Sequence, residues 1–338
     1  MKVDLSKLKD LILKIKRPKE GFSFGIDIGT ATVKMVKLKF HADQVELCAF
    51  DLKPSLKEIS PSINDSQVNI SVSGPSTVMR YVNLPRMKSE ELKQSLRFEA
   101  QKYIPFPIAE VNLDSWILNE HASNNEMLVL LAAAKKDCVS QRVKLAQDAG
   151  LKVSSLDIDS AALLNAFIYN YQPGSEKLKT VGLLNIGAGT SNLNILEDNT
   201  PRLSRDICIA GAHFTQKIVD SLVVDLKAAE GLKLNPGKDK LDRINLSVKG
   251  VLSSLAGEIR TSFDYYESRS GAAVEKIFLS GGGSLFGGLK DMLAELLGVG
   301  VEYWDPLSKI TVAGSFDPDK IKAQSSQLAV AVGLALRR

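Results

Sequence analysis

The sequence contains little cysteine and no long apolar run. Cys48, Cys138 and Cys208 are an odd number of cysteines without metal-ligand spacing, so we expect reduced, mostly buried thiols and no disulfide. The longest uncharged apolar run, Met127 to Ala134, is far too short to cross a bilayer. The N-terminus also lacks the apolar stretch that a secretory signal requires. These absences predict a cytoplasmic protein.

The excess of positive charge is confined to the start of the chain. Residues 1–20 contain seven Lys or Arg and three acidic residues, and this difference equals the net charge of +4 of the whole chain. The remainder is therefore neutral overall. Because binding to nucleic acid depends on a basic surface, a neutral body argues against nucleic acid as a partner.

The basic segment, residues 1–20, has the pattern of an amphipathic helix. Five apolar residues between Leu5 and Ile15 fall on one side of a helix with lysines beside them, and Pro18 ends it. Two interpretations stay open. The helix docks on the body, or residues 3–17 lie on an anionic membrane surface, where each basic residue adds about 1 kcal/mol.

The stretch GIDIGTATVK, residues 25–34, sets an acid and a glycine between two alternating apolar stretches. This pattern predicts a strand, a tight turn and a second strand. Asp27 can simply cap the turn. Alternatively, main-chain N–H groups exposed around Gly29 form an anion site. A single glycine hairpin does not decide between the two.

A second stretch, LLNIGAGTSNLNIL at residues 183–196, repeats the first at a constant offset of 158 residues. Asn185 then corresponds to Asp27, and Gly187 to Gly29. Two such turns, each near the start of one half of the chain, indicate a duplicated protein with facing halves. Facing turns of this kind can bind the β- and γ-phosphates of a nucleotide from both sides.

The rest of the chain alternates strands with helices, which predicts the α/β class. We expect Ser89 to cap one helix and residues 212–232 to form another. Near the C-terminus a strand runs through the glycines at 281–283 into a helix. Their side-chain-free surface offers a place for a flat base.

This order of elements resembles the actin-like ATPase superfamily of actin, MreB, FtsA and the sugar kinases. Within it, the chain is similar to the PilM family of type IV pilus assembly proteins through stretches such as EAQKYIPFP, LSGGGSLFGGL and AVGLALR. The resemblance spans residues 21–338. It implies a duplicated, actin-like (ribonuclease H-like) fold with two lobes around a nucleotide cleft and an additional subdomain.

The resemblance also implies how the chain divides after the N-terminal helix. Subdomain 1A would comprise residues 21–85 and 155–180 with the C-terminal helix 326–338, and the partner-binding subdomain 1C would comprise residues 86–154. The second lobe would comprise subdomain 2A, residues 181–211 and 272–325, and subdomain 2B, residues 212–271.

For the site, the resemblance implies ATP or ADP with Mg²⁺. Asp27 would face the Mg²⁺ through water, and Lys34 takes the place of a phosphate-contacting lysine, although such a lysine is usually only solvated. The resemblance also implies contacts from the two turns to the phosphates, through Gly29, Thr30, Gly187, Gly189 and Thr190. Glu230 and Lys233 of AEGLK would contact the ribose or base, and Gly281, Gly282 and Gly283 would line the adenine side. For Glu230 and Lys233, a helix-surface salt bridge is the alternative.

One position departs from the superfamily pattern. Relatives usually carry aspartate where this chain has Asn185, and an amide is a poorer ligand for a hard cation and cannot act as a general base. Asp159 lies near the superfamily's water-orienting acid, or it caps its helix. We therefore expect the protein to bind ATP and to hydrolyse it slowly or not at all; turnover like that of a committed ATPase would refute this.

In the family, a groove beside the additional subdomain takes the cytoplasmic N-terminal peptide of the inner-membrane protein PilN. The residues expected there are Arg80, Arg97, Glu99, Tyr103 and Phe106, with core packing as the alternative for Tyr103. The resemblance thus implies an ATP-binding scaffold at the cytoplasmic face of the inner membrane, among other platform proteins of a pilus, DNA-uptake or type II secretion machine. Self-association stays open.

Two other functions of the superfamily also stay open. A self-polymerising filament protein like FtsA or MreB would sediment with ATP at micromolar concentration, whereas an adaptor would stay in solution. A sugar-type kinase needs an acid to deprotonate its substrate hydroxyl, and Asn185 removes the most obvious acid.

Overall fold

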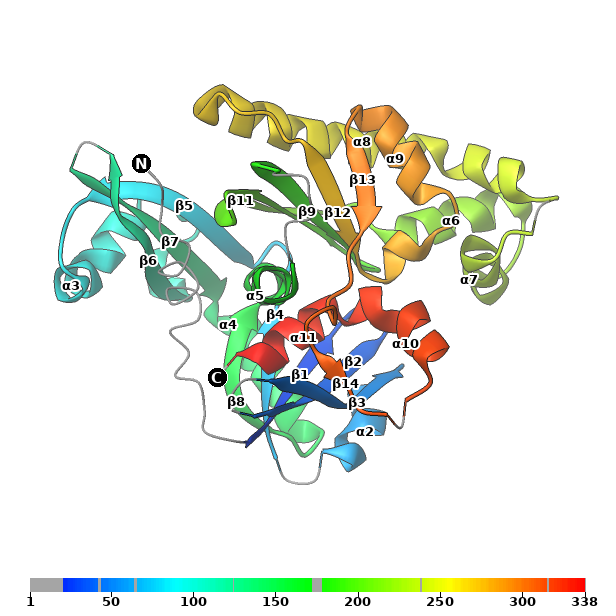
Figure 1. Ribbon diagram of the computed structural model, residues 1–338, viewed down its shortest axis with the longest axis horizontal. Coiled ribbons are helices and arrows are strands. Elements are labelled where there is room, and N and C mark those ends of the chain that lie inside the picture. The colour runs from blue at the N-terminus through cyan, green and yellow to red at the C-terminus, as the bar shows by residue number, and fades with distance from the viewer. Residues whose placement is uncertain are drawn as a thin grey trace.

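The computed structural model describes residues 21–41, 44–63, 66–123, 125–171, 178–237, 239–314 and 316–337. The expected helix at 1–20, with the expected membrane contact through residues 3–17, lies outside the described residues. The described strands form three sheets. Two of these sheets lie on opposite sides of a layer that contains the helices α5 (Asp159–Asn170) and α11 (Ala329–Leu336) (Figure 1).

The first sheet has the strand order β14-β3-β2-β1-β4-β8. Strands β1, β2 and β3 are antiparallel neighbours, while β4 and β8 continue the sheet in parallel to β1. The strands are β1 (Gly21–Ile28), β2 (Val33–Phe40), β3 (Val45–Lys53), β4 (Gln67–Val72), β8 (Lys152–Ile158) and β14 (Thr311–Val312).

The second sheet repeats this plan in the order β11-β10-β9-β12-β13. Its strands are β9 (Thr180–Ile186), β10 (Ser191–Glu197), β11 (Thr200–Ile207), β12 (Lys276–Ser280) and β13 (Gly300–Tyr303). The two hairpins even share their register. Asp27 faces Lys34 in the first, and Asn185 faces Asn192 in the second, again at an offset of 158 residues. The repeat found in the sequence is therefore a repeat of topology.

The third sheet is antiparallel, with the order β5-β7-β6. It consists of β5 (Thr77–Pro85), β6 (Val111–Ser123) and β7 (Glu126–Lys135), and the helix α3 (Ser89–Ala100) packs against one face through a separate apolar core. Strand β7 continues directly into α4 (Lys136–Asp148), so this sheet is joined to the first lobe by a helix as well as by the loop before β5.

The helices α5 and α11 share one hydrophobic core with residues of both large sheets. Two glycines allow α11 to come this close. A Cβ at Gly333 would lie 1.7 Å from the Ala162 carbonyl oxygen of α5, and a Cβ at Gly25 would lie 2.1 Å from the Ala331 carbonyl oxygen. The helix therefore contacts both α5 and β1 backbone to backbone.

The second lobe is completed by the helices α6 (Gly211–Leu222), α7 (Leu226–Leu234), α8 (Leu241–Ser270) and α9 (Leu289–Leu297). The single helix expected over residues 212–232 is wrong. Val223 adopts a left-handed conformation with φ of 53° and ends α6, and the Asp225 side chain then starts α7 by accepting a hydrogen bond from the Ala228 N–H at 2.7 Å.

The shorter elements are the helices α2 (Leu56–Ile59) and α10 (Pro318–Gln324) and the 3₁₀ turns η1 (Ser60–Ser62), η2 (Ile108–Glu110), η3 (Gly282–Leu285) and η4 (Ser325–Leu328). One expected cap also differs by a residue. Ser89 is the first residue of α3, and the capping position is Lys88, whose N–H donates to the Glu91 carboxylate at 2.8 Å.

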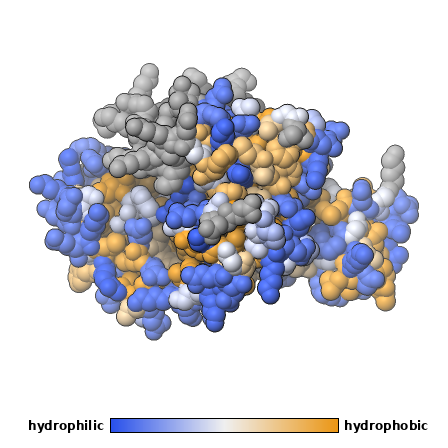
Figure 2. Space-filling model, turned by 90° about the horizontal axis from the view of Figure 1, so that it is seen from below, coloured by the Kyte–Doolittle hydropathy of each residue, from blue (hydrophilic) through white to orange (hydrophobic). Residues whose placement is uncertain are grey.

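The cysteines are free thiols, as expected, but they are not mostly buried. Cys208 is exposed, and Cys48 and Cys138 are partly exposed. Among the described residues, no helix combines the length and the apolar character needed to span a membrane. The face in Figure 2 is largely hydrophilic, with separate apolar areas between the charged side chains. The subdomain limits expected from the sequence stay a prediction.

Candidate functional site

The first turn joins β1 to β2 next to a buried ion pair. Lys34 Nζ donates to Asp27 Oδ2 at 2.9 Å, and both side chains are largely buried. A Cβ at Gly29 would lie 2.7 Å from this Nζ and 2.8 Å from the Thr32 carbonyl oxygen. A side chain at position 29 would therefore displace the lysine. Lys34 is thus not a merely solvated lysine, while its contact with a ligand stays a prediction.

The second turn lies against the first. Its hairpin is closed by a hydrogen bond from the Gly187 N–H to the Thr190 carbonyl at 3.1 Å. A Cβ at Gly189 would lie 2.8 Å from Thr30 Oγ1 of the first turn. The structure therefore brings the two predicted turns together, although they are more than 150 residues apart in the sequence.

The glycines after β12 pack on the end of the second hairpin. Gly281 has φ of +89°, and a Cβ there would lie 2.4 Å from the Ile186 carbonyl oxygen; a Cβ at Gly283 would lie 2.7 Å from that of Gly187. Gly282 differs, because its Cβ would meet only the flexible end of Gln327, at 3.2 Å. Gly281 and Gly283 therefore serve close packing, whereas position 282 has room for a side chain.

The AEGLK residues form a polar network beside these glycines. Lys233 Nζ is buried and donates to Thr215 Oγ1 at 2.9 Å and to Glu230 Oε1 at 2.7 Å. The Thr215 hydroxyl also donates to Glu230. A Cβ at Gly211, on the same helix as Thr215, would lie 3.0 Å from the Gly187 carbonyl oxygen.

The salt bridge of the alternative interpretation therefore exists as a pair on α7, in which the Glu230 side chain is about half exposed and Lys233 is buried, and contact of either residue with a ligand stays a prediction. Lys233 is only 5% exposed, and its ammonium lies at the junction of α6 and α7. Thr215, which holds this lysine, was not predicted as a site residue. Nothing in its local sequence marks it, because its role depends on the packing of α6 against α7.

Asp159 is the first residue of α5, and the capping position is Ile158, without a side-chain cap bond. The capping interpretation of Asp159 is therefore wrong. Burial and the neighbouring charge of Asp27 raise the pKa of Asp159 from 3.8 to about 7, against the opposing effect of nearby hydroxyls and of Arg142. Asp27 and Asp159 thus lie close enough, at one end of the first sheet, for the charge of Asp27 to disfavour ionisation of Asp159.

Arg142 was also not predicted from the sequence. Its Nη1 donates to the Ile28 carbonyl at 2.7 Å, so a side chain of α4 holds the last residue of β1, next to the first turn. The two residues are 114 positions apart in the chain. Asn185, the residue that departs from the superfamily pattern, is buried, and its Oδ1 accepts a hydrogen bond from the Ser280 hydroxyl at 3.1 Å.

The residues expected at the partner groove lie around α3 and β5. Arg80 and Arg97 are exposed, and Glu99 pairs with Lys102 at 2.9 Å. Tyr103 and Phe106 are partly buried against the core beneath α3, which agrees with the alternative of core packing for Tyr103. Phe98 was not predicted from the sequence, and it leaves 68% of its surface exposed on α3.

The residues present at the two turns fit a nucleoside polyphosphate. Main-chain N–H groups and a lysine are groups that bind phosphate oxygens, and the glycines let the two turns approach each other closely. No group of three or more His, Cys, Asp or Glu side chains that could hold a metal occurs in the described part of the chain. Mg²⁺ needs fewer protein ligands, since one or two carboxylates and the phosphates suffice, and Asp27 would hold such an ion through water.

Two sheets that share the order and direction of five strands, joined through a common layer of helices, define an actin-like fold, and solved structures agree. The chain is similar to the ethanolamine utilization protein EutJ from Carboxydothermus hydrogenoformans, with a TM-score of 0.57, 15% identity, and 99% of this chain and 97% of that chain covered. It is also similar to MreB5 of Spiroplasma citri bound to ADP, with a TM-score of 0.50, 13% identity, and 94% and 95% covered. The predicted fold class is confirmed.

The family can be stated as well. The family model described as type IV pilus assembly protein PilM matches residues 51–338, and the chain belongs to this family. It is similar over its length to a solved PilM–PilN type IV pilus biogenesis complex, with a TM-score of 0.82, 27% identity, and 95% of this chain and 98% of that chain covered. The family predicted from the sequence motifs is thereby confirmed.

Replacing Asp159 by asparagine should stabilise the folded protein at pH 8 and have little effect near pH 4. The folded carboxyl has its pKa raised to about 7. Its ionisation is therefore less favourable in the folded protein than in the unfolded chain, and this difference lowers the stability of the folded protein. The contribution of Asp159 to the stability of the wild type is lost as the pH rises from about 4 through 7, by up to about 4 kcal/mol. Urea unfolding of both proteins across this range measures the difference.

The matched control for this prediction is Asp264→Asn, which changes an exposed carboxyl on α8. It should leave the pH profile of the wild type unchanged. A stability difference between Asp159→Asn and the wild type that stays constant from pH 4 to pH 8 would contradict the raised pKa.

Proposed function

We propose that this type IV pilus assembly protein is an ATP-binding scaffold at the cytoplasmic face of the inner membrane. It binds the N-terminal peptide of a PilN-like membrane protein, and its nucleotide acts mainly as a structural ligand. The observation that carries the proposal is the contact of Thr30 with Gly189, because it places two glycine turns from opposite lobes at one point.

The nucleotide would be held by groups from both lobes. The N–H groups of the two turns and Lys34 would bind the phosphates, Asp27 would bind a water of the Mg²⁺ ion, and Glu230 with Lys233 would contact the ribose or base. A ligand held by both lobes stabilises the protein by about 2.7 kcal/mol at 100 times its Kd. It would also favour one arrangement of the lobes.

Slow hydrolysis is part of the proposal. Asn185 brings no charge to the second turn, and its amide oxygen already accepts the Ser280 hydroxyl. Asp27 is paired with Lys34, which leaves Asp159 as the carboxyl of this group able to orient a water. A pKa of about 7 suits a general base, so we assign any residual hydrolysis to Asp159.

The partner part of the proposal is supported by the similarity to the solved PilM–PilN complex. The third sheet offers a surface for an extended peptide, because β5 pairs only with β7 among the described strands and edge strands carry unpaired main-chain groups. Arg80, Arg97 and the exposed ring of Phe98 lie on β5 and α3, beside this edge and on the helix that covers the sheet.

Replacing Gly282 by arginine should abolish nucleotide binding without unfolding the protein. The new side chain would enter the adenine side of the site, and only the end of Gln327 would have to move to admit its Cβ. Thermal unfolding with and without Mg-ATP measures the effect: the nucleotide should raise the midpoint of the wild type and not that of Gly282→Arg. The control is Gly257→Arg in open space on α8. If Mg-ATP still raises the thermal midpoint of Gly282→Arg, the proposed nucleotide site is wrong.

Replacing Asn185 by aspartate should raise ATP hydrolysis by on the order of 10- to 100-fold, because it restores a carboxylate that can orient water or hold the metal. Phosphate release by the purified protein measures the rate. Asn194→Asp, on the next strand, serves as a buried control of the same chemistry. The role given to Asn185 would be contradicted by a wild type that already hydrolyses ATP as fast as a committed ATPase. It would also be contradicted by an Asn185→Asp variant that hydrolyses ATP no faster than the wild type.

Reversing the charge of Arg97 should weaken binding of a PilN-like N-terminal peptide about tenfold, which corresponds to about 1.4 kcal/mol. Arg97 is exposed, so its replacement by glutamate should leave the fold intact. Fluorescence anisotropy of the labelled peptide measures the Kd. Arg269→Glu, on the remote end of α8, is the control. Equal affinities for both variants would exclude Arg97 from the partner surface.

A further inference from the structure

The second hairpin differs from the first in what its central pair of residues contacts. In the first hairpin, Asp27 faces Lys34 and binds it. In the second, the position of Lys34 is taken by Asn192, which faces Asn185. The Asn192 Nδ2 donates to Asp206 Oδ1 at 2.5 Å. The second hairpin therefore orients a carboxylate on the neighbouring strand β11.

The other oxygen of Asp206 reaches the first lobe. Asp206 Oδ2 accepts a hydrogen bond from the Gly74 N–H at 2.9 Å, across 132 positions of the chain. Gly74 follows β4 and has φ of +84°, a conformation that favours glycine, and a Cβ on it would lie 4.0 Å from Thr190 Oγ1 of the second turn. This single carboxylate thus joins the two lobes beside the second turn.

The loop that carries Gly74 leads from the end of β4 to the third sheet. It follows β4, whose end lies beside Asp159. The Gly74 carbonyl accepts hydrogen bonds from the N–H and the hydroxyl of Thr77, each at 3.0 Å, and Thr77 is the first residue of β5. The Ser76 carbonyl accepts the Lys135 N–H of β7 at 2.9 Å. Any shift of Gly74 is therefore passed to the edge strand β5.

Strand β5 also contacts β11 directly, so Asp206 lies where the second lobe meets the third sheet. The carboxylate is held on both sides, by Asn192 and by Gly74. Its geometry depends on β10, which begins where the second turn ends. A ligand that fixes the second turn would thereby fix the position of Asp206, and with it the start of β5.

We propose that Asp206 is a positioning residue that couples nucleotide in the cleft to the partner-binding edge strand β5 through the Gly74 amide. The inference rests on the proposed function, because it requires nucleotide between the turns and a partner at the third sheet. When nucleotide binds the second turn, the hydrogen bond between Asp206 and the Gly74 amide is kept, and β5 is held in the form that the partner binds. Couplings of this kind typically change an affinity about 5- to 150-fold.

Hydrogen–deuterium exchange of the full chain, with and without Mg-ATP, tests the coupling without a partner peptide. In the wild type, Mg-ATP should slow exchange in both turns and, about fivefold or more, in β5. In Asp206→Ala the turns should still be protected, whereas the slowing in β5 should be lost. Asp206→Asn, which keeps an acceptor for the Gly74 amide, should restore it. If Asp206→Ala does not fold, Asp206→Ser, whose hydroxyl is too short to reach Gly74, makes the same test.

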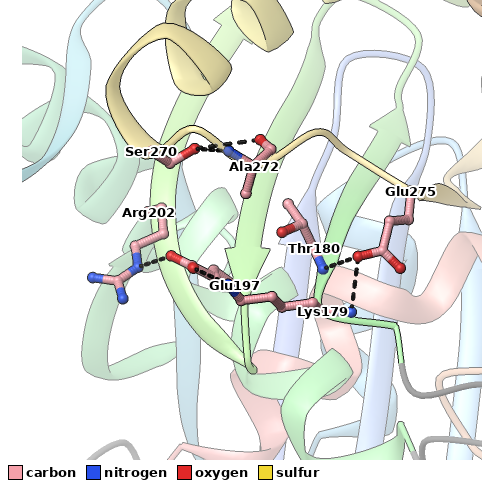
Figure 3. Close-up of polar contacts among 7 residues, drawn as sticks. All are labelled: Lys179, Thr180, Glu197, Arg202, Ser270, Ala272 and Glu275. Atoms are coloured by element: carbon pink, nitrogen blue, oxygen red, sulfur yellow. Dashed lines mark hydrogen bonds and ion pairs between the residues drawn. The ribbon is translucent and has the colours of Figure 1, made fainter.

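The control is Glu197→Ala at the far end of the same hairpin. Glu197 binds Lys179 at 3.3 Å and Arg202 at 3.2 Å, away from the turns (Figure 3), so its loss should leave the response of β5 unchanged. The coupling is overturned if Mg-ATP slows exchange in β5 of Asp206→Ala as much as in β5 of the wild type. It is also overturned if, in the wild type, Mg-ATP slows exchange in the two turns but not in β5. Absence of protection in both turns overturns the proposed nucleotide site itself.

Discussion

The arrangement of both lobes depends on the close packing of α11 against α5 and β1. All eight residues of α11 are buried, and the glycines at 25 and 333 allow contact between backbones. The Asn69 side chain holds the end of the helix by donating to the Leu334 and Arg337 carbonyls, each at 3.1 Å. Because the surrounding core takes residues from both sheets, the distance between the two hairpins is set by apolar packing.

This constraint explains why the site can be assembled from glycines. With the sheets held by their shared core, the turns meet at Thr30 and Gly189, and Asp27 pairs with Lys34 beside the first turn. A preorganised site of this kind spends little binding energy on ordering its own groups. It suits a protein that holds a nucleotide for its effect on shape more than for chemistry.

The sequence alone predicted the hairpins, because alternating apolar residues and turn glycines are local signals, and the offset of 158 residues made the repeat visible. It failed where tertiary contacts decide. The helix over residues 212–232 is broken at Val223, whose left-handed conformation no local pattern announces. Arg142 and Asp206 act across 114 and 132 positions, and a single sequence gives no sign of such pairs. Thr215 was missed for the same reason.

The duplicated hairpins have also diverged in charge. The first half keeps a carboxylate balanced by an ammonium group, while the facing pair of the second half is two neutral amides, Asn185 and Asn192. The carboxylate that contacts this pair, Asp206, lies on β11 and accepts hydrogen bonds from Asn192 and from the Gly74 N–H. The two hairpins thus differ in role: the first pairs a carboxylate with an ammonium group, and the second positions Asp206, whose carboxylate joins the lobes.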